Sequence, residues 1–172
     1  MTVIDEILAA NKRFAARVMS DPLLKAPSRA VAVLTCMDTQ IAVEQALGIG
    51  AADAHIIRNA GGIASKDAIR SLIVSHHFFG AKEVMVINHA NCIGAITKSD
   101  EAMREELAQK TRKDASFPQH FHGFEDAASN VRLQISRITN HPWIPTSVVV
   151  RGFLFEEDTG RLLEVFPISE PA

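Results

Sequence analysis

The sequence has little net charge and no long apolar run. Its 172 residues include 18 basic and 20 acidic side chains, which gives a formal net charge of -2. Nucleic-acid-binding domains concentrate positive charge on one surface, so this balance gives no reason to expect a nucleic acid as a partner. The sequence also lacks internal repeats and low-complexity segments.

The first helix-like segment, "MTVIDEILAANKRFAARV", places a charged residue among its apolar residues every three or four positions. A signal peptide needs an uninterrupted apolar stretch, and a membrane span needs about 20 apolar residues. The sequence therefore predicts a protein with no membrane partner, located in the cytoplasm.

Only two cysteines occur, Cys36 and Cys92. In a reducing compartment, such a pair indicates metal binding or catalysis before it indicates a disulfide. A chain of this length can bury an ordinary core without disulfide or metal cross-links, so residues 1–172 are expected to form a single domain.

Short runs rich in Val and Ile alternate with stretches that have helical spacing. The expected strands are residues 30–35, 54–58, 83–88 and 147–155, and the expected helices are residues 66–79 and 125–140. This alternation predicts an α/β fold with a mainly parallel central sheet flanked by helices. The turn sequence at residues 158–160 predicts that the last strand returns antiparallel at an edge.

Residues 1–20 are expected to form a separate, projecting N-terminal helix. Thr2 can cap this helix, and Val3, Ile7, Phe14 and Val18 give it one apolar face. A linker with two prolines follows, so the apolar face needs a surface on the same body or on a neighbouring subunit.

Two of the expected strands end in residues that can bind metal. Cys36 and Asp38 follow the first strand, whereas His89 and Cys92 follow the third. Open parallel sheets place their sites at the carboxyl ends of strands, and two thiolates with one imidazole suit a tetrahedral zinc that keeps one position open. Each residue alone has a more ordinary explanation, since a cysteine is often a buried apolar residue and a histidine often an edge hydrogen-bonding group.

The motifs resemble those of the beta class of carbonic anhydrases, from the first helix to the last hairpin. That family has Cys-x-Asp-x-Arg after one strand and His-x-x-Cys after another, and this chain has "CMDTQ" and "HANC". The resemblance is to short bacterial members and to a branch of carbonyl sulfide hydrolases. It implies a zinc held by Cys36, His89 and Cys92, a zinc-bound hydroxide that attacks carbon dioxide, and a homodimer or dimer of dimers.

The sequence departs from the family at Gln40, where the family has an arginine that pairs with the aspartate. Glutamine brings no charge, so an ionised Asp38 would leave the zinc site at -1. Three outcomes are open: Asp38 becomes the fourth zinc ligand, Asp38 keeps a proton, or another cation such as Arg58 compensates. Asp38 and Gln40 are the candidate catalytic residues.

The expected substrate pocket is formed by Gly61, Gly62 and Ile93. The glycines allow the backbone to approach the site closely. The chain has Asn91 and Ile93 where relatives usually have Asp and Gly, so the surroundings of the metal are expected to be less polar.

Three functions fit these residues. The first is a zinc lyase of the carbonic anhydrase kind, or a related hydrolase that acts on carbonyl sulfide or carbon disulfide. The second is a non-catalytic homologue whose zinc is closed by Asp38. The third is a dithiol redox protein, which the absence of a Cys-x-x-Cys motif disfavours.

Overall fold

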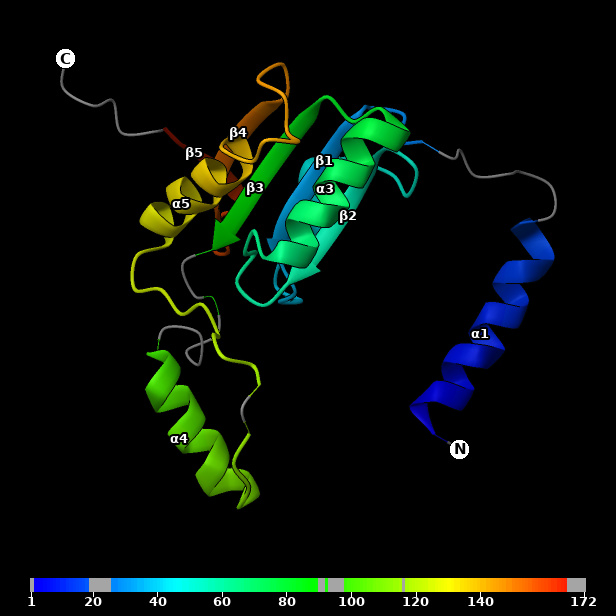
Figure 1. Cartoon of the computed structure of the whole chain (residues 1–172). Helices are drawn as coiled ribbons and strands as arrows, with labels where there is room; N and C mark the ends of the chain where they lie inside the picture. Colours follow the sequence, from blue (N-terminus) through cyan, green and yellow to red (C-terminus); the bar gives the residue numbers. More distant parts are fainter. Residues whose placement is uncertain (1, 19–25, 90–91, 93–97, 116, 167–172) are drawn as a thin grey trace, which may run out of the picture.

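The computed structural model describes residues 2–18, 26–89, 92, 98–115 and 117–166 (Figure 1). Its centre is a five-stranded sheet with the strand order β2-β1-β3-β4-β5. The strands are β1 (Val31–Cys36), β2 (Ala54–Asn59), β3 (Glu83–His89), β4 (Val149–Glu156) and β5 (Arg161–Val165). The first four are mutually parallel and β5 is antiparallel to β4, which confirms the predicted sheet.

Helices α3 (Lys66–Phe79) and α5 (Ala127–Thr139) lie side by side across the same face of the sheet (Figure 1). Both are helices that the apolar spacing predicts. The α3 helix begins at Ser65, whose side chain accepts a hydrogen bond from the Ala68 N–H group. Asp126 caps α5 in the same way, by accepting from the Ser129 N–H group.

The sheet is buried on both faces, which explains why its central strands are continuous apolar runs. One core cluster lies under α3 and α5, and it includes Leu34, Leu72 and Val131. The opposite cluster contains Val33, Ile41, Phe155 and both cysteines. The cysteines are therefore part of the apolar packing at one end of the sheet.

Two helices lack an apolar stripe long enough to predict them. Helix α2 (Val43–Leu47) is only five residues long. Helix α4 (Asp100–Thr111) has no buried residue, so its sequence carries no period of apolar positions. Its N-terminus is nevertheless regular, because Ser99 accepts a hydrogen bond from the Ala102 N–H group.

Helix α1 (Val3–Val18) stands apart from the sheet (Figure 1). The Asp5 N–H group donates to Thr2 Oγ1 at 3.3 Å, as expected for the predicted cap. The side chains described on the predicted apolar face are exposed: Val3 is 70% exposed, Ile7 60% and Phe14 58%. None of the described helices combines the length and apolarity that a membrane crossing requires.

Candidate metal centre

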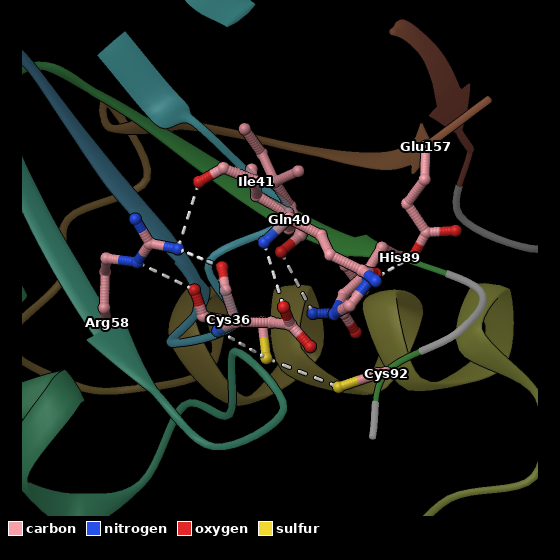
Figure 2. Close-up of polar contacts among 10 residues, drawn as sticks. Cys36, Gln40, Ile41, Arg58, His89, Cys92 and Glu157 are labelled. Atoms are coloured by element: carbon pink, nitrogen blue, oxygen red, sulfur yellow. Dashed lines mark hydrogen bonds and ion pairs between the residues drawn. The ribbon is translucent and has the colours of Figure 1, made fainter. Parts of the chain in front are cut away.

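The parallel sheet brings two cysteines and one histidine together. Cys36 is the last residue of β1 and His89 the last of β3, which is the neighbouring strand, while Cys92 lies three residues further on. The possible ligand atoms of the three residues all lie within 4.8 Å of one another. The two Sγ atoms are 3.4 Å apart (Figure 2).

The arrangement of these side chains fits a metal ion. His89 is fully buried, and its Nε2 atom has no hydrogen-bond partner, a costly state for a buried polar atom unless something binds it. In a tetrahedral zinc site with Zn–S bonds of about 2.3 Å, two sulfurs lie about 3.8 Å apart, close to the observed separation. Two sulfurs and one imidazole nitrogen are also a donor set that suits zinc.

The other ring nitrogen of His89 is held by Glu157. His89 Nδ1 contacts the Oε1 atom of Glu157, which follows β4 in the turn to β5 (Figure 2). This contact favours the tautomer with the proton on Nδ1 and leaves the Nε2 lone pair for a ligand bond. Burial alone would lower the pKa of His89, but the neighbouring Cys36 and Glu157 side chains outweigh it and raise that pKa.

The two thiols influence each other strongly. The hydrogen bond between the sulfurs lowers the pKa of Cys36 and raises that of Cys92, because a single proton is shared between them. The pair therefore favours one thiolate on its own, and a cation is needed to stabilise the second.

Asp38 lies beside this group without belonging to it. The three-residue cluster does not include its carboxylate, whose Oδ1 atom accepts a hydrogen bond of 2.9 Å from the Gln40 backbone N–H group. The donor is the main-chain N–H group of Gln40, whose side chain is exposed. Among the described residues, no lysine or arginine forms an ion pair with Asp38.

Arg58 approaches the same loop but binds its main chain. The guanidinium donates to the carbonyl oxygens of Cys36 at 2.9 Å, Asp38 at 2.5 Å and Ile41 at 3.1 Å (Figure 2). Arg58 therefore holds the loop that follows β1 and does not pair with the Asp38 carboxylate. It leaves a positive charge near the site without making the contact that an arginine at position 40 would make.

The turn after β2 approaches the end of β1 closely. Gly61 and Gly62 both have positive φ values, +84° and +61°, which L side chains rarely adopt. A Cβ atom on Gly62 would lie 2.6 Å from Asn88 Nδ2 and 3.2 Å from the Cys36 nitrogen. The glycines thus allow the turn to lie against the backbone of Cys36. Ile93, the third predicted pocket residue, lies outside the described residues, as does Asn91.

Two neighbours of the site have no sequence motif that would identify them. Glu157 is one of several acidic residues in the last hairpin, and only the pairing of His89 with Phe155 explains why it reaches His89. Phe124, from the loop before α5, packs against the cluster that contains both cysteines. A Cβ atom on Gly61 would lie 3.3 Å from the Phe124 ring, so this aromatic side chain lies directly against the turn.

Comparisons with known proteins agree with this geometry. The carbonic anhydrase family model matches residues 31–162. Beta-carbonic anhydrase 1 of Mycobacterium tuberculosis is 35% identical over 167 residues, which cover 97% of this chain and all of that one. Carbon disulfide hydrolase of Saccharolobus solfataricus is 38% identical over 152 residues, covering 76% of this chain and 74% of that one.

Comparison with solved structures gives the same family relationship. The crystal structure of carbonic anhydrase from Streptococcus mutans superposes with a TM-score of 0.87 at 37% identity, covering 96% of this chain and 99% of that one. The apo form of a carbon disulfide hydrolase gives a TM-score of 0.70 at 30% identity, with 98% and 95% of the two chains covered. From its sequence, its sheet and its cysteine–histidine cluster, the chain belongs to the beta-carbonic anhydrase family.

Proposed function

We propose that this protein is a zinc enzyme that hydrates carbon dioxide to bicarbonate. One observation carries the proposal: His89 Nε2 is buried and has no hydrogen-bond partner, and a ring nitrogen of His89 lies within 4.8 Å of both cysteine sulfurs. A buried imidazole nitrogen without a hydrogen-bond partner is stabilised when this nitrogen and the two cysteine sulfurs bind the same cation. The relatedness to beta-carbonic anhydrases supports zinc as that cation and carbon dioxide as the substrate.

Cys36, His89 and Cys92 would hold the zinc. When bound, zinc is a Lewis acid that lowers the pKa of a water molecule to about 7 and so provides a nucleophile at neutral pH. Glu157 keeps the proton of His89 on Nδ1. The apolar cluster around the cysteines limits the entry of bulk water and strengthens the electrostatic interactions within the site.

Asp38 is the proposed partner of the reacting water. Its Oδ1 atom is fixed by the Gln40 N–H group, and no described residue donates to its Oδ2 atom. Oδ2 can therefore accept a hydrogen bond from the water that adds to the carbon of the substrate, and orient that water. Hydration forms one C–O bond and releases one proton, which must pass to solvent through an acceptor of this kind.

The second candidate reaction is hydrolysis of carbonyl sulfide or carbon disulfide. Carbon disulfide hydrolases are 38% and 36% identical to this chain, and the packing of Phe124 near the cysteines gives the site an apolar wall. Carbonyl sulfide would consume one water and give carbon dioxide and hydrogen sulfide. Carbon disulfide would consume two waters and give carbon dioxide and two molecules of hydrogen sulfide.

We also propose that the protein acts as a homodimer or as a dimer of dimers. The side chains of Val3, Ile7 and Phe14 on α1 are exposed in the single chain, and Ile4 and Leu8 extend the patch with exposures of 68% and 54%. Such a helix is marginal in isolation, so a second copy is the expected cover for it. Sedimentation equilibrium tests this by comparing the full chain with a variant that carries Ile4→Ser, Ile7→Ser and Leu8→Ser. The assembly formed by the variant should have a lower molar mass than that of the parent.

The test of the enzymatic function begins with metal analysis of the purified protein, which should contain one zinc per chain. Stopped-flow hydration of carbon dioxide is then followed from pH 6 to 9, with carbonyl sulfide and carbon disulfide tested in parallel by release of sulfide. Hydration should rise with pH and should disappear in Cys92→Ser together with the zinc. Faster turnover of a sulfur substrate than of carbon dioxide would establish the second candidate instead.

Two results would contradict both enzymatic proposals. A zinc-loaded protein that is inactive on all three substrates would be a binding protein, and Asp38 as fourth ligand would explain its inactivity. A folded protein that contains no metal, and that is unchanged by serine at either cysteine position, would remove the metal centre altogether.

A further inference from the structure

Three buried amide side chains form a continuous row between α5 and the end of β3. Gln134 Nε2 donates to Asn130 Oδ1 at 2.6 Å, and Asn130 Nδ2 donates to Asn88 Oδ1 at 2.6 Å. Asn88 Nδ2 in turn donates to the Gly61 carbonyl oxygen at 3.0 Å. We call Gln134, Asn130 and Asn88 the amide row.

Every amide in this row has the same direction. Each NH2 group donates along the row toward the Gly61 carbonyl oxygen, so reversal of one amide would place two oxygens or two NH2 groups together. The far end is fixed as well, because Gln134 Oε1 accepts from the Ala64 backbone N–H group at 2.9 Å and from Arg137 at 3.3 Å. The orientation of Asn88 is thus determined from α5.

Such a row is costly in a core of this kind. The exposures of Asn88, Asn130 and Gln134 are 0%, 5% and 0%, and they lie next to apolar residues such as Val131. Burial of three amides stabilises the fold only if every donor and acceptor is satisfied, and apolar residues of similar size would avoid that cost. The row therefore points to a role beyond filling space.

The near end of the row reaches the turn that touches the metal cluster. Asn88 holds the carbonyl oxygen of Gly61, which lies in that turn. Gly62 is pressed against Asn88 on one side and the backbone of Thr35 and Cys36 on the other. A shift of Asn88 would therefore move the turn relative to the backbone of Cys36.

We propose that Asn130 and Gln134 are positioning residues of the metal centre, which act through Asn88 and the Gly61 carbonyl to hold the glycine turn against the backbone of Cys36. The inference rests on the proposed metal binding by Cys36, His89 and Cys92. Neither residue touches the cluster itself. Their effect is to fix the backbone that carries a ligand sulfur, because groups behind the ligands orient them toward the metal.

The test uses full-length protein loaded with cobalt(II), whose thiolate charge-transfer band in the near ultraviolet reports the sulfur–metal bonds directly. Asn130→Leu interrupts the row, and Gln134→Leu removes the group that orients Asn130. Affinity for cobalt is measured by competition with a chromophoric chelator, and melting temperature is recorded in parallel. Val131→Ala is the matched control, because Val131 is a fully buried residue of α5 outside the row.

Both row variants should bind cobalt about tenfold more weakly than the parent and should shift the charge-transfer band. Val131→Ala should lower the melting temperature but leave the band and the affinity unchanged. If Asn130→Leu does not fold, Gln134→Leu alone decides the question.

Two outcomes would overturn the inference, and they are distinguishable. If the parent binds cobalt and the row variants match its band and affinity, the row is only structural. If the parent shows no thiolate band at all, the proposed metal centre fails and the inference fails with it.

Discussion

His89 and Glu157 face each other across the ends of β3 and β4, and their contact occupies only the Nδ1 side of the imidazole. The opposite nitrogen, Nε2, is left inside the protein beside two sulfurs. A carboxylate behind a histidine is the usual support for a metal-binding imidazole, because it fixes the ring and increases its basicity. This relationship leads to the first prediction.

Glu157→Gln should weaken zinc binding by roughly tenfold, since an amide oxygen can accept from Nδ1 but supplies no charge. Zinc affinity measured with a competing chelator checks this. Asp158→Asn is the matched control: it makes the same chemical change at the next, exposed position of the hairpin and should leave the affinity unchanged. Equal affinities for parent and Glu157→Gln would mean that the carboxylate does not support the ligand.

Asp38→Asn separates two roles of this aspartate. The carboxylate lies outside the three-residue cluster, so the variant should keep its full zinc content. Its kcat/KM for carbon dioxide should nevertheless fall on the order of a hundredfold, because an amide accepts and orients a water proton less well. Loss of zinc from this variant, measured by elemental analysis, would identify Asp38 as a ligand instead.

Gln40→Arg adds a positive charge beside a carboxylate that has no ion-pair partner among the described residues. A nearby cation favours the deprotonated forms of the site, so the rise of activity with pH should move to lower pH. The shift should be at most about one pH unit, because position 40 is exposed and water and salt screen the charge.

Gln45→Arg on α2 is the control for that experiment, since it adds the same charge at another exposed position. Its pH profile should match that of the parent. A profile of Gln40→Arg that is also unchanged would show that the missing arginine does not limit this protein.

Gly62→Ala should destabilise the protein far more than Gly160→Ala, although both glycines have positive φ values, +61° and +69°. A Cβ atom at Gly160 meets nothing within 4 Å, so only the backbone strain remains, about 1 kcal/mol. At Gly62 the new atom must also displace Asn88, at a further cost of about 1–3 kcal/mol for a disrupted buried hydrogen bond. Urea unfolding of the two variants measures this difference, and equal losses would contradict the close packing of the turn.

The sequence predicts the fold well where burial imposes a period on the chain. The predicted strand 83–88 corresponds to Glu83–His89, and the predicted helix 66–79 to Lys66–Phe79. Helix α4 escapes prediction because it buries nothing, and therefore its apolar residues follow no pattern. The parallel order of β1 and β3 is what turns two distant motifs into one cluster.

The surroundings of the cluster are less accessible to such reasoning. The distance from Asn130 to Asn88 depends on how α5 lies across the sheet, and the reach of Glu157 depends on the register of β3 with β4. The role of the Gln40 backbone could not be foreseen from side-chain chemistry either, because any residue at position 40 except proline offers the same N–H group. Local sequence identifies the possible ligands, whereas tertiary packing determines how they are held.

Cys36 and Cys92 are 56 residues apart in the sequence, so an ion bound by both sulfurs closes a long loop. Such a metal cross-link lowers the conformational entropy of the unfolded chain, much as a covalent cross-link does, but it is reversible. Each tenfold rise in free zinc above the dissociation constant would then add about 1.4 kcal/mol to the free energy of unfolding. The lifetime of the protein against proteolysis would thereby follow the metal supply of its compartment.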